Sequence, residues 1–398
     1  MNEMSNESLR FFRLEKPALV VGLVGLAATA FLALQAQNHD QFFRSWLVAF
    51  VFWMSLTVGS LAIAMLQYMT GGWWGYIIRK PLLAATGNLP LMVIAALPVY
   101  LGMDRIYTWT NHELMTHDAI LSKKLAYLNP EAFWIRGAVF FAIWIFWAFM
   151  LRRSDRRYDE TGTQEAALTL RKWSASGLLI TAVTVTFASV DWMMSLDPYW
   201  FSTMFGISYI VGAVLLAFAF MNAIVTSASD QSPIADVAEP VHFRDLGNLM
   251  FAFVMLWAYT AFSQYLLIWY ANIKEEIPWY IIRSHGAWGA ISVLLIVGHF
   301  FLPFLLLLMR GIKDRAKFLG KVAIFILVMR AIDYYWIIAP NWTTEGHHAS
   351  FHPHALDFTT ILGIGGIWTF MFLRNLKKGA VLPAHESLEG AKEAVSHG

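Results

Sequence analysis

The sequence predicts an all-α integral membrane protein with ten transmembrane helices, eight of them in two tandem four-helix bundles and two peripheral. The first observation is composition: of 398 residues, 58% are hydrophobic and only 14% are charged, whereas soluble proteins have about 25% charged residues. The second is a series of long apolar segments separated by polar connections. The third is a motif that recurs with constant spacing in the two halves of the chain, which indicates a parallel repeat.

Ten apolar segments are long enough to cross a bilayer core of about 30 Å. In order, they are residues 17–36, 45–68, 81–102, 132–151, 175–195, 200–226, 246–270, 284–309, 318–338 and 357–373. The third contains Asn88 and Pro90, so we expect a break at Gly87–Pro90, and the tenth is short. The longest connection is 103–131.

The distribution of Lys and Arg predicts the orientation. Twenty of these residues lie outside the spans on the side of the N-terminus, and six lie on the other side. Because cytoplasmic loops carry the excess of basic residues, both termini are expected in the cytoplasm. The chain is therefore expected to cross the membrane many times.

The repeated motif is D-[WY]-x5-P-x-W, at the ends of the fifth and ninth spans. It reads "DWMMSLDPYW" from Asp191 and "DYYWIIAPNW" from Asp333, an offset of 142 residues. The proline is expected to end each helix, with the carboxylate about two turns before it. A helix stop explains the proline and tryptophan of the motif but not the aspartate, because a carboxylate inside a span needs a partner.

Two weaker matches have the same separation of four spans. The tripeptide "GNL" occurs at 87–89 and 247–249, and Arg136 and Arg283 stand at the starts of the fourth and eighth spans. Spans two to five and six to nine are therefore expected to form the two bundles. The predicted parts of the chain are 1–44 (N-terminus and first helix), 45–199 (first bundle), 200–342 (second bundle) and 343–398 (outer loop, tenth helix and tail).

Composition also excludes several classes of function. The chain has no cysteine, which excludes disulfides, Fe–S ligation, CxxCH haem attachment and thiolate catalysis. The net charge is +2 and no basic block is present, so lipids are expected as partners and nucleic acids are not. Any electron carriers must belong to other chains or be dissolved in the lipid.

His285 and His299 lie fourteen residues apart in the eighth span, a spacing at which one helix can offer ligands to two stacked haems. Two bis-histidine haems need four histidines on two facing helices. Only these two of the twelve histidines fall within the spans. A dihaem cytochrome is therefore rejected, and His285 is expected at the membrane interface.

Charged residues inside spans are expensive and are functional hypotheses by default. Arg330 and Asp333 are spaced i, i+3 on the ninth span and can reach each other. Such a pair is either purely structural or part of a site that handles protons. Asp191, the counterpart in the first bundle, has Ala188 rather than an arginine three residues earlier.

His299, Tyr259 and Gln264 add further polar side chains to the predicted second bundle. For His299 three interpretations remain: a hydrogen bond to a neighbouring helix, a protonatable relay, or a haem or metal ligand. The candidates for a proton path are therefore Asp333, Arg330, His299, Tyr259 and Gln264, with Asp191 as the counterpart in the first bundle.

The loop after the ninth span concentrates histidines beside Glu345. They are His347, His348, His352 and His354. Imidazole clusters can bind zinc or copper, but the irregular spacing in a polar loop favours a solvated or partner-contacting surface. We expect no catalytic, cofactor-binding or metal-binding residue in this chain.

Three stretches carry a resemblance to a known family. "DWMMSLDPYWFSTMFG", "FSQYLLIWYANIKEEIPWY" and "HFFLPFLLLLMRGIK" resemble the ActF subunits of bacterial alternative complex III, within the NrfD-like or polysulfide-reductase membrane family. The resemblance extends from the first span to the tenth. It implies ten helices in two four-helix bundles with two peripheral helices.

The resemblance also implies membership of a quinol:cytochrome c, or other acceptor, oxidoreductase. The implied partners are a sister NrfD-like subunit that binds quinol, an Fe–S subunit of the molybdopterin-enzyme type, and multihaem and monohaem cytochrome c subunits. Haem c and Fe–S clusters would belong to those partners, and quinol to the complex. The subunit resembled here is the haemless membrane module, with implied roles in assembly and proton translocation.

Besides a purely structural scaffold inside the complex, two other functions stay open. The chain could be the quinol-binding anchor of a molybdoenzyme-type reductase. It could also be a secondary transporter, since parallel repeats and buried charges suit that class. Transporters usually break paired helices near the midplane, whereas here span seven lacks the proline of span three.

Overall fold

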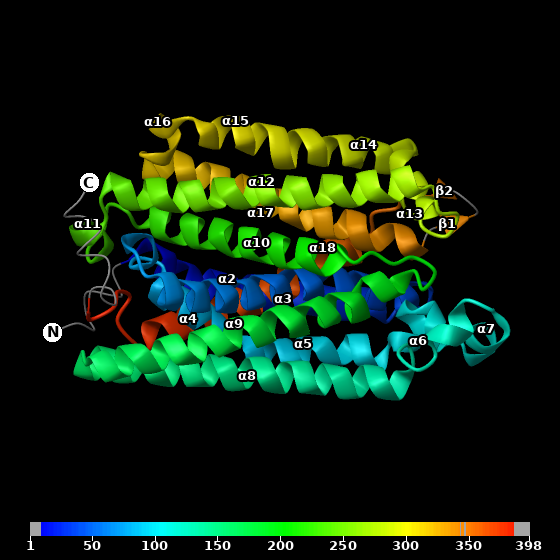
Figure 1. Ribbon diagram of the computed structural model, residues 1–398, viewed down its shortest axis with the longest axis horizontal. Helices are drawn as coiled ribbons and strands as arrows, with labels where there is room; N and C mark the ends of the chain where they lie inside the picture. Colours follow the sequence, from blue (N-terminus) through cyan, green and yellow to red (C-terminus); the bar gives the residue numbers. More distant parts are fainter. Residues whose placement is uncertain (1–8, 343, 346–347, 386–398) are drawn as a thin grey trace.

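Long helices run side by side along the length of the molecule (Figure 1). The computed structural model describes residues 9–342, 344–345 and 348–385. Within them, nine helices are long and apolar enough to cross a membrane, and a bent pair makes a tenth span. The spans are α2 (Glu15–Ala33), α3 (His39–Thr70), α4 (Arg79–Thr86) with α5 (Leu89–Leu101), α8 (Pro130–Thr161), α9 (Gln164–Trp192), α10 (Phe205–Ser227), α12 (Pro240–Ala271), α14 (Gly286–Leu294) with η7 (Leu295–Phe301) and α15 (Leu302–Leu308), α17 (Ala316–Ile338) and α18 (Ala355–Lys377). The chain is thus a multi-pass helical membrane protein, as the sequence predicts.

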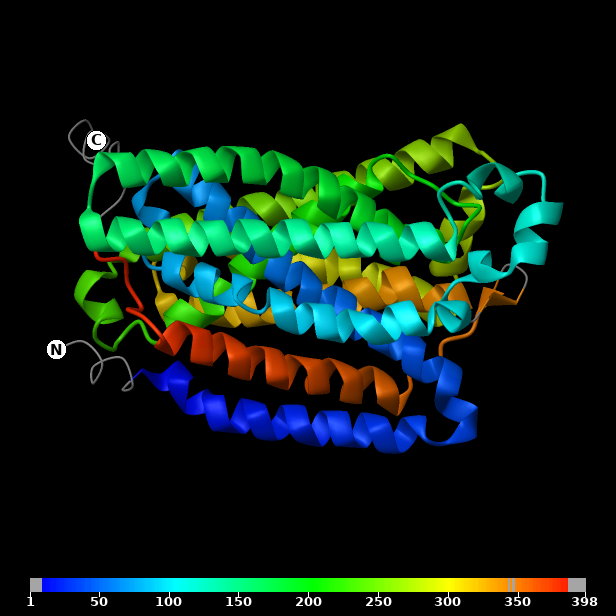
Figure 2. The same ribbon diagram turned by 90° about the horizontal axis from the view of Figure 1, so that it is seen from below.

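Short elements connect the spans. The short helices are η1 (Arg10–Leu14), η2 (Ala36–Asn38), η3 (Trp73–Gly75), α6 (Met103–Ile106), η4 (Thr108–Thr110), α7 (His112–His117), η5 (Leu121–Lys124), η6 (Met194–Leu196), α11 (Ile234–Val237), α13 (Ile277–Ser284), α16 (Arg310–Lys313) and η8 (Ala339–Trp342). The strands β1 (Thr344–Glu345) and β2 (His348–Ala349) pair antiparallel. The start of α2 and the end of α18 lie at the same end of the bundle (Figure 2), which we name the termini side; the other end is the opposite side.

The third span is broken where the sequence predicts a break. Helices α4 and α5 meet at an angle of 42°, and Pro90 stands in the first turn of α5, where its missing N–H costs nothing. The buried side chain of Asn88 is hydrogen-bonded to α18 at the break. Its Nδ2 donates to the Trp368 carbonyl (2.8 Å), and its Oδ1 accepts from Asn375 Nδ2 (3.0 Å). Helix α12 runs continuously through the second "GNL".

Helices α3 and α10 form the centre of the molecule and pack directly against each other. A Cβ on Gly59 of α3 would overlap the backbone of Ala213 in α10, so glycine is required for this close approach. The hydroxyls of Ser55, Thr57 and Ser60 donate to the carbonyls four residues earlier. Those bonds satisfy the hydroxyls without a second helix, which suits a buried span.

The first and last spans pair at one edge of the bundle. Figure 2 shows α2 (blue) and α18 (red) side by side, and α18 also packs on α3. Gly25 lies against the backbone of Gly363, and the Thr29 hydroxyl donates to Thr359 Oγ1 (3.0 Å). Small residues let the two backbones approach closely, as is typical of helix pairs in membranes.

The two prolines of the repeated motif act differently. Helix α17 continues to Ile338, and Pro340 lies in η8 directly after it, as predicted. The prediction is wrong for Pro198, because α9 already ends at Trp192. The chain then turns through η6, and Asp197 Oδ1 accepts from the backbone N–H groups of Tyr199 and Trp200. Asp191 is therefore at the end of its helix rather than two turns inside it.

We predict that Gly25→Leu destabilises the protein. A Cβ at this position would lie 2.7 Å from the Gly363 nitrogen, so α2 and α18 must move apart, at a cost of about 1–3 kcal/mol. Thermal unfolding of the purified protein in detergent should show a lower midpoint. Gly311→Leu is the control, because a Cβ there meets nothing within 4 Å; equal midpoints for the two variants would contradict this packing.

Candidate functional site

Arg330 and Asp333 of α17 form a fully buried ion pair through Arg330 Nη1 and Asp333 Oδ2. The two residues are only 1% and 3% exposed. The predicted i, i+3 contact is thereby confirmed. Because an ion removed from water loses several kcal/mol of solvation, each charge here depends on its partner and on the polar groups around it.

The Arg330 guanidinium is held by two further contacts. Its Cζ lies 4.3 Å from the centre of the Tyr334 ring, a distance at which the ring face attracts a cation. From α10, Gly212 faces the guanidinium so closely that a Cβ would come within 2.7 Å of Cζ. Arg330 Nε is buried and has no hydrogen-bond partner among the described residues.

Trp257 of α12 connects Asp333 to His299. Its indole interacts with the Asp333 carboxylate, and its ring centre lies 4.0 Å from that of His299. His299 is fully buried, and neither ring nitrogen has a hydrogen-bond partner within the described part of the chain. It lies in the π-helical segment η7, a type of helix that occurs often at functional sites.

Hydroxyl groups extend the site toward α3. The Tyr334 ring contacts Tyr209 of α10 edge to face, with centres 6.1 Å apart. The Tyr209 hydroxyl and Ser55 Oγ are hydrogen-bonded at 2.9 Å. We name this whole group the central cluster. It consists of Ser55, Tyr209, Trp257, His299, Arg330, Asp333 and Tyr334.

The structure brings together three of the six residues that the sequence singles out: Asp333, Arg330 and His299. Tyr259 is 65% exposed on the outer face of α12 and lies away from them. Gln264 is buried but belongs to another set of contacts: its Nε2 donates to the Tyr280 hydroxyl (3.1 Å), and its Oε1 accepts from Ser202 Oγ (3.3 Å).

Asp191 lies in a separate ion pair with Arg136 of α8. Arg136 Nε and Nη2 donate to the two carboxylate oxygens at 2.8 and 2.9 Å, and its Cζ lies 3.8 Å from the centre of the Tyr127 ring. Sequence reasoning noticed both residues but did not pair them, since they stand on different spans. The signal was present, because the end of one span and the start of its antiparallel neighbour lie at the same depth.

Arg283, which matches Arg136 in the sequence, has different contacts. It donates to the carbonyls of Trp336 (3.2 Å) and Ile337 (2.7 Å) and stacks on Trp279, with Cζ 3.6 Å from the ring centre. Burial lowers the pKa of Arg283, and the charge of Asp197 acts in the opposite direction. The sequence match between these arginines therefore does not extend to the ion pair.

A second buried ionic network lies on the termini side. Lys80 Nζ bonds Asp155 Oδ2 (2.6 Å) and also Asp159, and Tyr68 donates to Asp155 Oδ1 (2.6 Å). Residues near the end of the chain pack over it: His385 contacts the Asp159 carbonyl at 3.0 Å. Sequence analysis missed this network because α4 and α8 extend beyond the apolar segments from which their bounds were predicted.

Of the outer histidines, the structure describes the side chains of His352 and His354. His354 Nδ1 accepts from the Leu356 N–H at the start of α18. His347 and the side chains of Glu345 and His348 lie outside the described residues. Of the residues that are described, no three His, Asp or Glu side chains are grouped so as to hold a metal ion. His285 is exposed at the N-terminus of α14.

A scan against protein-family models and a search of curated proteins give no match to this chain. The central cluster joins a carboxylate, an imidazole and two phenols in a region without solvent exposure. Carboxylate and imidazole groups can both accept and release protons, and imidazole does so near neutral pH.

We predict that Arg136→Met destabilises the protein by about 3 kcal/mol, since it leaves the Asp191 carboxylate buried without a partner. The double variant Arg136→Met/Asp191→Leu should be more stable than this single variant, because it removes both charges. The free energy of unfolding in detergent measures the difference. Additive losses in the double variant would show that the two side chains do not interact.

Proposed function

We propose that the chain is a cofactor-free membrane subunit of a respiratory quinol:electron-acceptor oxidoreductase of the alternative complex III type. Its roles are to support assembly of the complex and to move protons across the membrane. The observation that carries the proposal is the central cluster, in which His299 has no hydrogen-bond partner among the described residues and lies beside a buried ion pair. Buried ionisable groups of this kind mark proton pathways in membrane proteins.

Each residue of the cluster has a separate role in this proposal. His299 and Asp333 take up and pass on protons, and Arg330 balances the charge when Asp333 is ionised. Trp257 holds the imidazole next to the carboxylate. The hydroxyls of Tyr209 and Ser55 continue the polar route toward α3.

The fold is consistent with two tandem bundles. We assign α3, α4–α5, α8 and α9 to the first and α10, α12, α14–α15 and α17 to the second, with α3 and α10 packed against each other between them. Residues Asp191 and Asp333 then occupy corresponding helices. Each has an arginine partner. The partner of Asp191 lies on the neighbouring helix α8, whereas the partner of Asp333 lies on the same helix, α17.

The partners and the location follow the resemblance. We propose that the termini side faces the cytoplasm of a bacterial inner membrane, in accord with the excess of Lys and Arg there. A sister NrfD-like subunit would bind quinol, while Fe–S and cytochrome c subunits on the opposite side would carry electrons. Lipid surrounds the exposed apolar faces of helices such as α2 and α12.

The main alternative is a quinol-binding anchor of a molybdoenzyme-type reductase. Quinone bound next to His299 or Asp333 would favour it, and the burial of both residues is the observation against it. A secondary transporter has less support. The break between α4 and α5 has no counterpart in the continuous α12, whereas transporter sites usually lie at paired breaks.

Membership of the complex predicts what accompanies the chain. Isolation of the tagged chain from native membranes in mild detergent should bring down proteins that carry c-type haem, detected by their absorption after reduction. The chain has no cysteine for haem attachment, so this absorption can only come from partners. A preparation that lacks haem and supports solute uptake in liposomes would instead identify a transporter.

Proton translocation predicts the behaviour of single variants of the purified, reconstituted complex. With Asp333→Asn or His299→Ala, proton release per electron should be lost while quinol oxidation continues, because the electron carriers lie in other subunits. Tyr259→Phe is the matched control, since that hydroxyl is on an exposed face. Undiminished pumping in Asp333→Asn and His299→Ala would refute the proposed role.

A further inference from the structure

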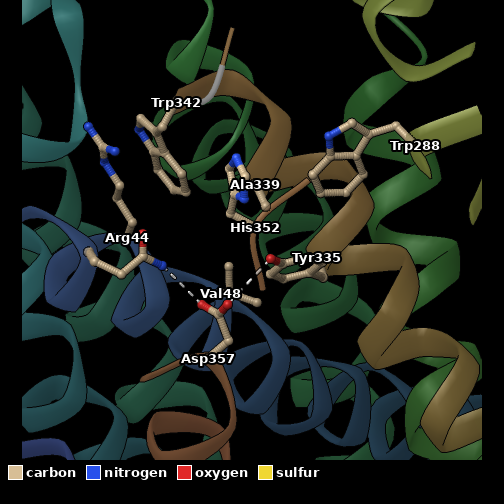
Figure 3. Close-up of a pocket in the computed structure, with 9 residues that line it drawn as sticks. Arg44, Val48, Trp288, Tyr335, Ala339, Trp342, His352 and Asp357 are labelled. Carbon is tan, nitrogen blue, oxygen red and sulfur yellow. Dashed lines mark hydrogen bonds between the residues drawn. The ribbon is translucent and has the colours of Figure 1, made fainter. Parts of the chain in front are cut away.

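A small pocket of about 20 Å³, partly open to solvent and large enough for a water molecule, lies on the opposite side between α3, α17 and the start of α18. Figure 3 shows Asp357 on its floor, with Tyr335 pointing at the carboxylate and with Trp288, Trp342 and His352 above. The pocket shares none of its lining residues with the central cluster. Its aromatic walls and polar floor are therefore not explained by the contacts described so far.

Asp357 accepts hydrogen bonds from α3, from α17 and from the backbone just before its own helix. Its Oδ1 accepts from Ser45 Oγ (2.5 Å) and Gln41 Nε2 (3.2 Å) of α3. Its Oδ2 accepts from the Tyr335 hydroxyl of α17 (3.3 Å) and the backbone N–H of His354 (2.8 Å). A carboxylate anchored on both oxygens keeps a fixed position at the boundary between the bundle and the pocket.

Besides Asp357, the pocket is lined by one arginine and one histidine. Arg44 of α3 has a buried Nε without a hydrogen-bond partner among the described residues, and its Cζ is 5.6 Å from the centre of the Trp342 ring. His352 lines the pocket, and His354 Nδ1 is engaged with the Leu356 N–H. The titratable or charged groups that face Asp357 are therefore Arg44, Tyr335, His352 and His354.

The pocket and the central cluster are stacked on the same two helices. On α3, Val48 lines the pocket and Ser55 belongs to the cluster; seven residues correspond to roughly 10 Å along a helix and return to the same face. On α17, Tyr335 lines the pocket, while Asp333 and Tyr334 belong to the cluster. Between the two levels lies Phe52, whose ring contacts Tyr334 edge to face at 6.4 Å.

We propose that this pocket is the outer end of the proton route and that Asp357 is the group through which protons from the central cluster reach the outer solution. The inference rests on the proposed function. A proton arriving from the cluster protonates the carboxylate, which then releases it to water in the pocket. No redox step is involved. Tyr335 is a positioning residue that holds the carboxylate toward α17. Val48 and Phe52 form an apolar layer between the two levels, and water must bridge this layer for the proton to pass.

The test uses the reconstituted complex and measures protons released outside per electron transferred, at several outer pH values. Asp357→Asn should lower this ratio toward that of Asp333→Asn without changing quinol oxidation or haem content. Asp357→Glu should restore the ratio with a shifted pH profile, which a merely structural role for Asp357 would not produce. Tyr335→Phe removes only one hydrogen bond to Asp357 and should lower the ratio less.

The outcomes separate the two proposals. Loss of pumping in Asp333→Asn with normal pumping in Asp357→Asn would overturn this inference and leave the proposed function intact. Normal pumping in both would overturn both. If Asp357→Asn prevents assembly, the pH profile of the assembled Asp357→Glu complex decides, and a profile identical to that of the unaltered complex counts against Asp357 as the exit group.

Discussion

The cost of placing a charge in a nonpolar interior governs how this molecule is built. Arg330 and Asp333 lie fully buried, so each must be neutralised within a few ångströms. That requirement explains why α10 carries Gly212 where the guanidinium lies and why Trp257 and Tyr334 surround the pair. The same requirement explains Arg136 with Asp191 and Lys80 with its two carboxylates. The helices are thus positioned by their ion pairs as well as by the apolar contacts between them.

This arrangement gives the three ion pairs different surroundings. The ion pairs of α8 with α9 and of α4 with α8 join neighbouring helices, and their donors and acceptors are largely satisfied. The pair on α17 lies within one helix, so it leaves His299, Tyr334 and Arg330 Nε with polar atoms that no described residue satisfies. Unsatisfied buried groups are expensive, and a site for mobile protons is a physical reason to retain them.

Hydropathy predicted the spans, because crossing a bilayer imposes a minimum apolar length, whereas Asn88 and Pro90 predicted the break in the third span. The Arg330–Asp333 contact was predictable because i, i+3 spacing is local to one helix. Which face of a helix points into the bundle was not predictable. Tyr259 is exposed, although it lies only two residues from Trp257 in the cluster. Contacts between helices were missed for the same reason, as with Arg136 and Asp191. The Lys80 network was missed because the helices extend beyond the apolar segments, and hydropathy does not predict helix or contacts in such polar extensions.

The pairing of α2 with α18 has a consequence for how the protein is made. The Thr29 and Thr359 hydroxyls that bond across this pair are 330 residues apart in the chain. At a synthesis rate of about 5–20 residues per second, the second helix follows the first by tens of seconds. During that interval the glycine face of α2 lacks its partner α18 and is available to lipid or to other helices. This edge of the bundle is therefore completed last. A chain whose synthesis stops before α18 has an α2 without its packing partner.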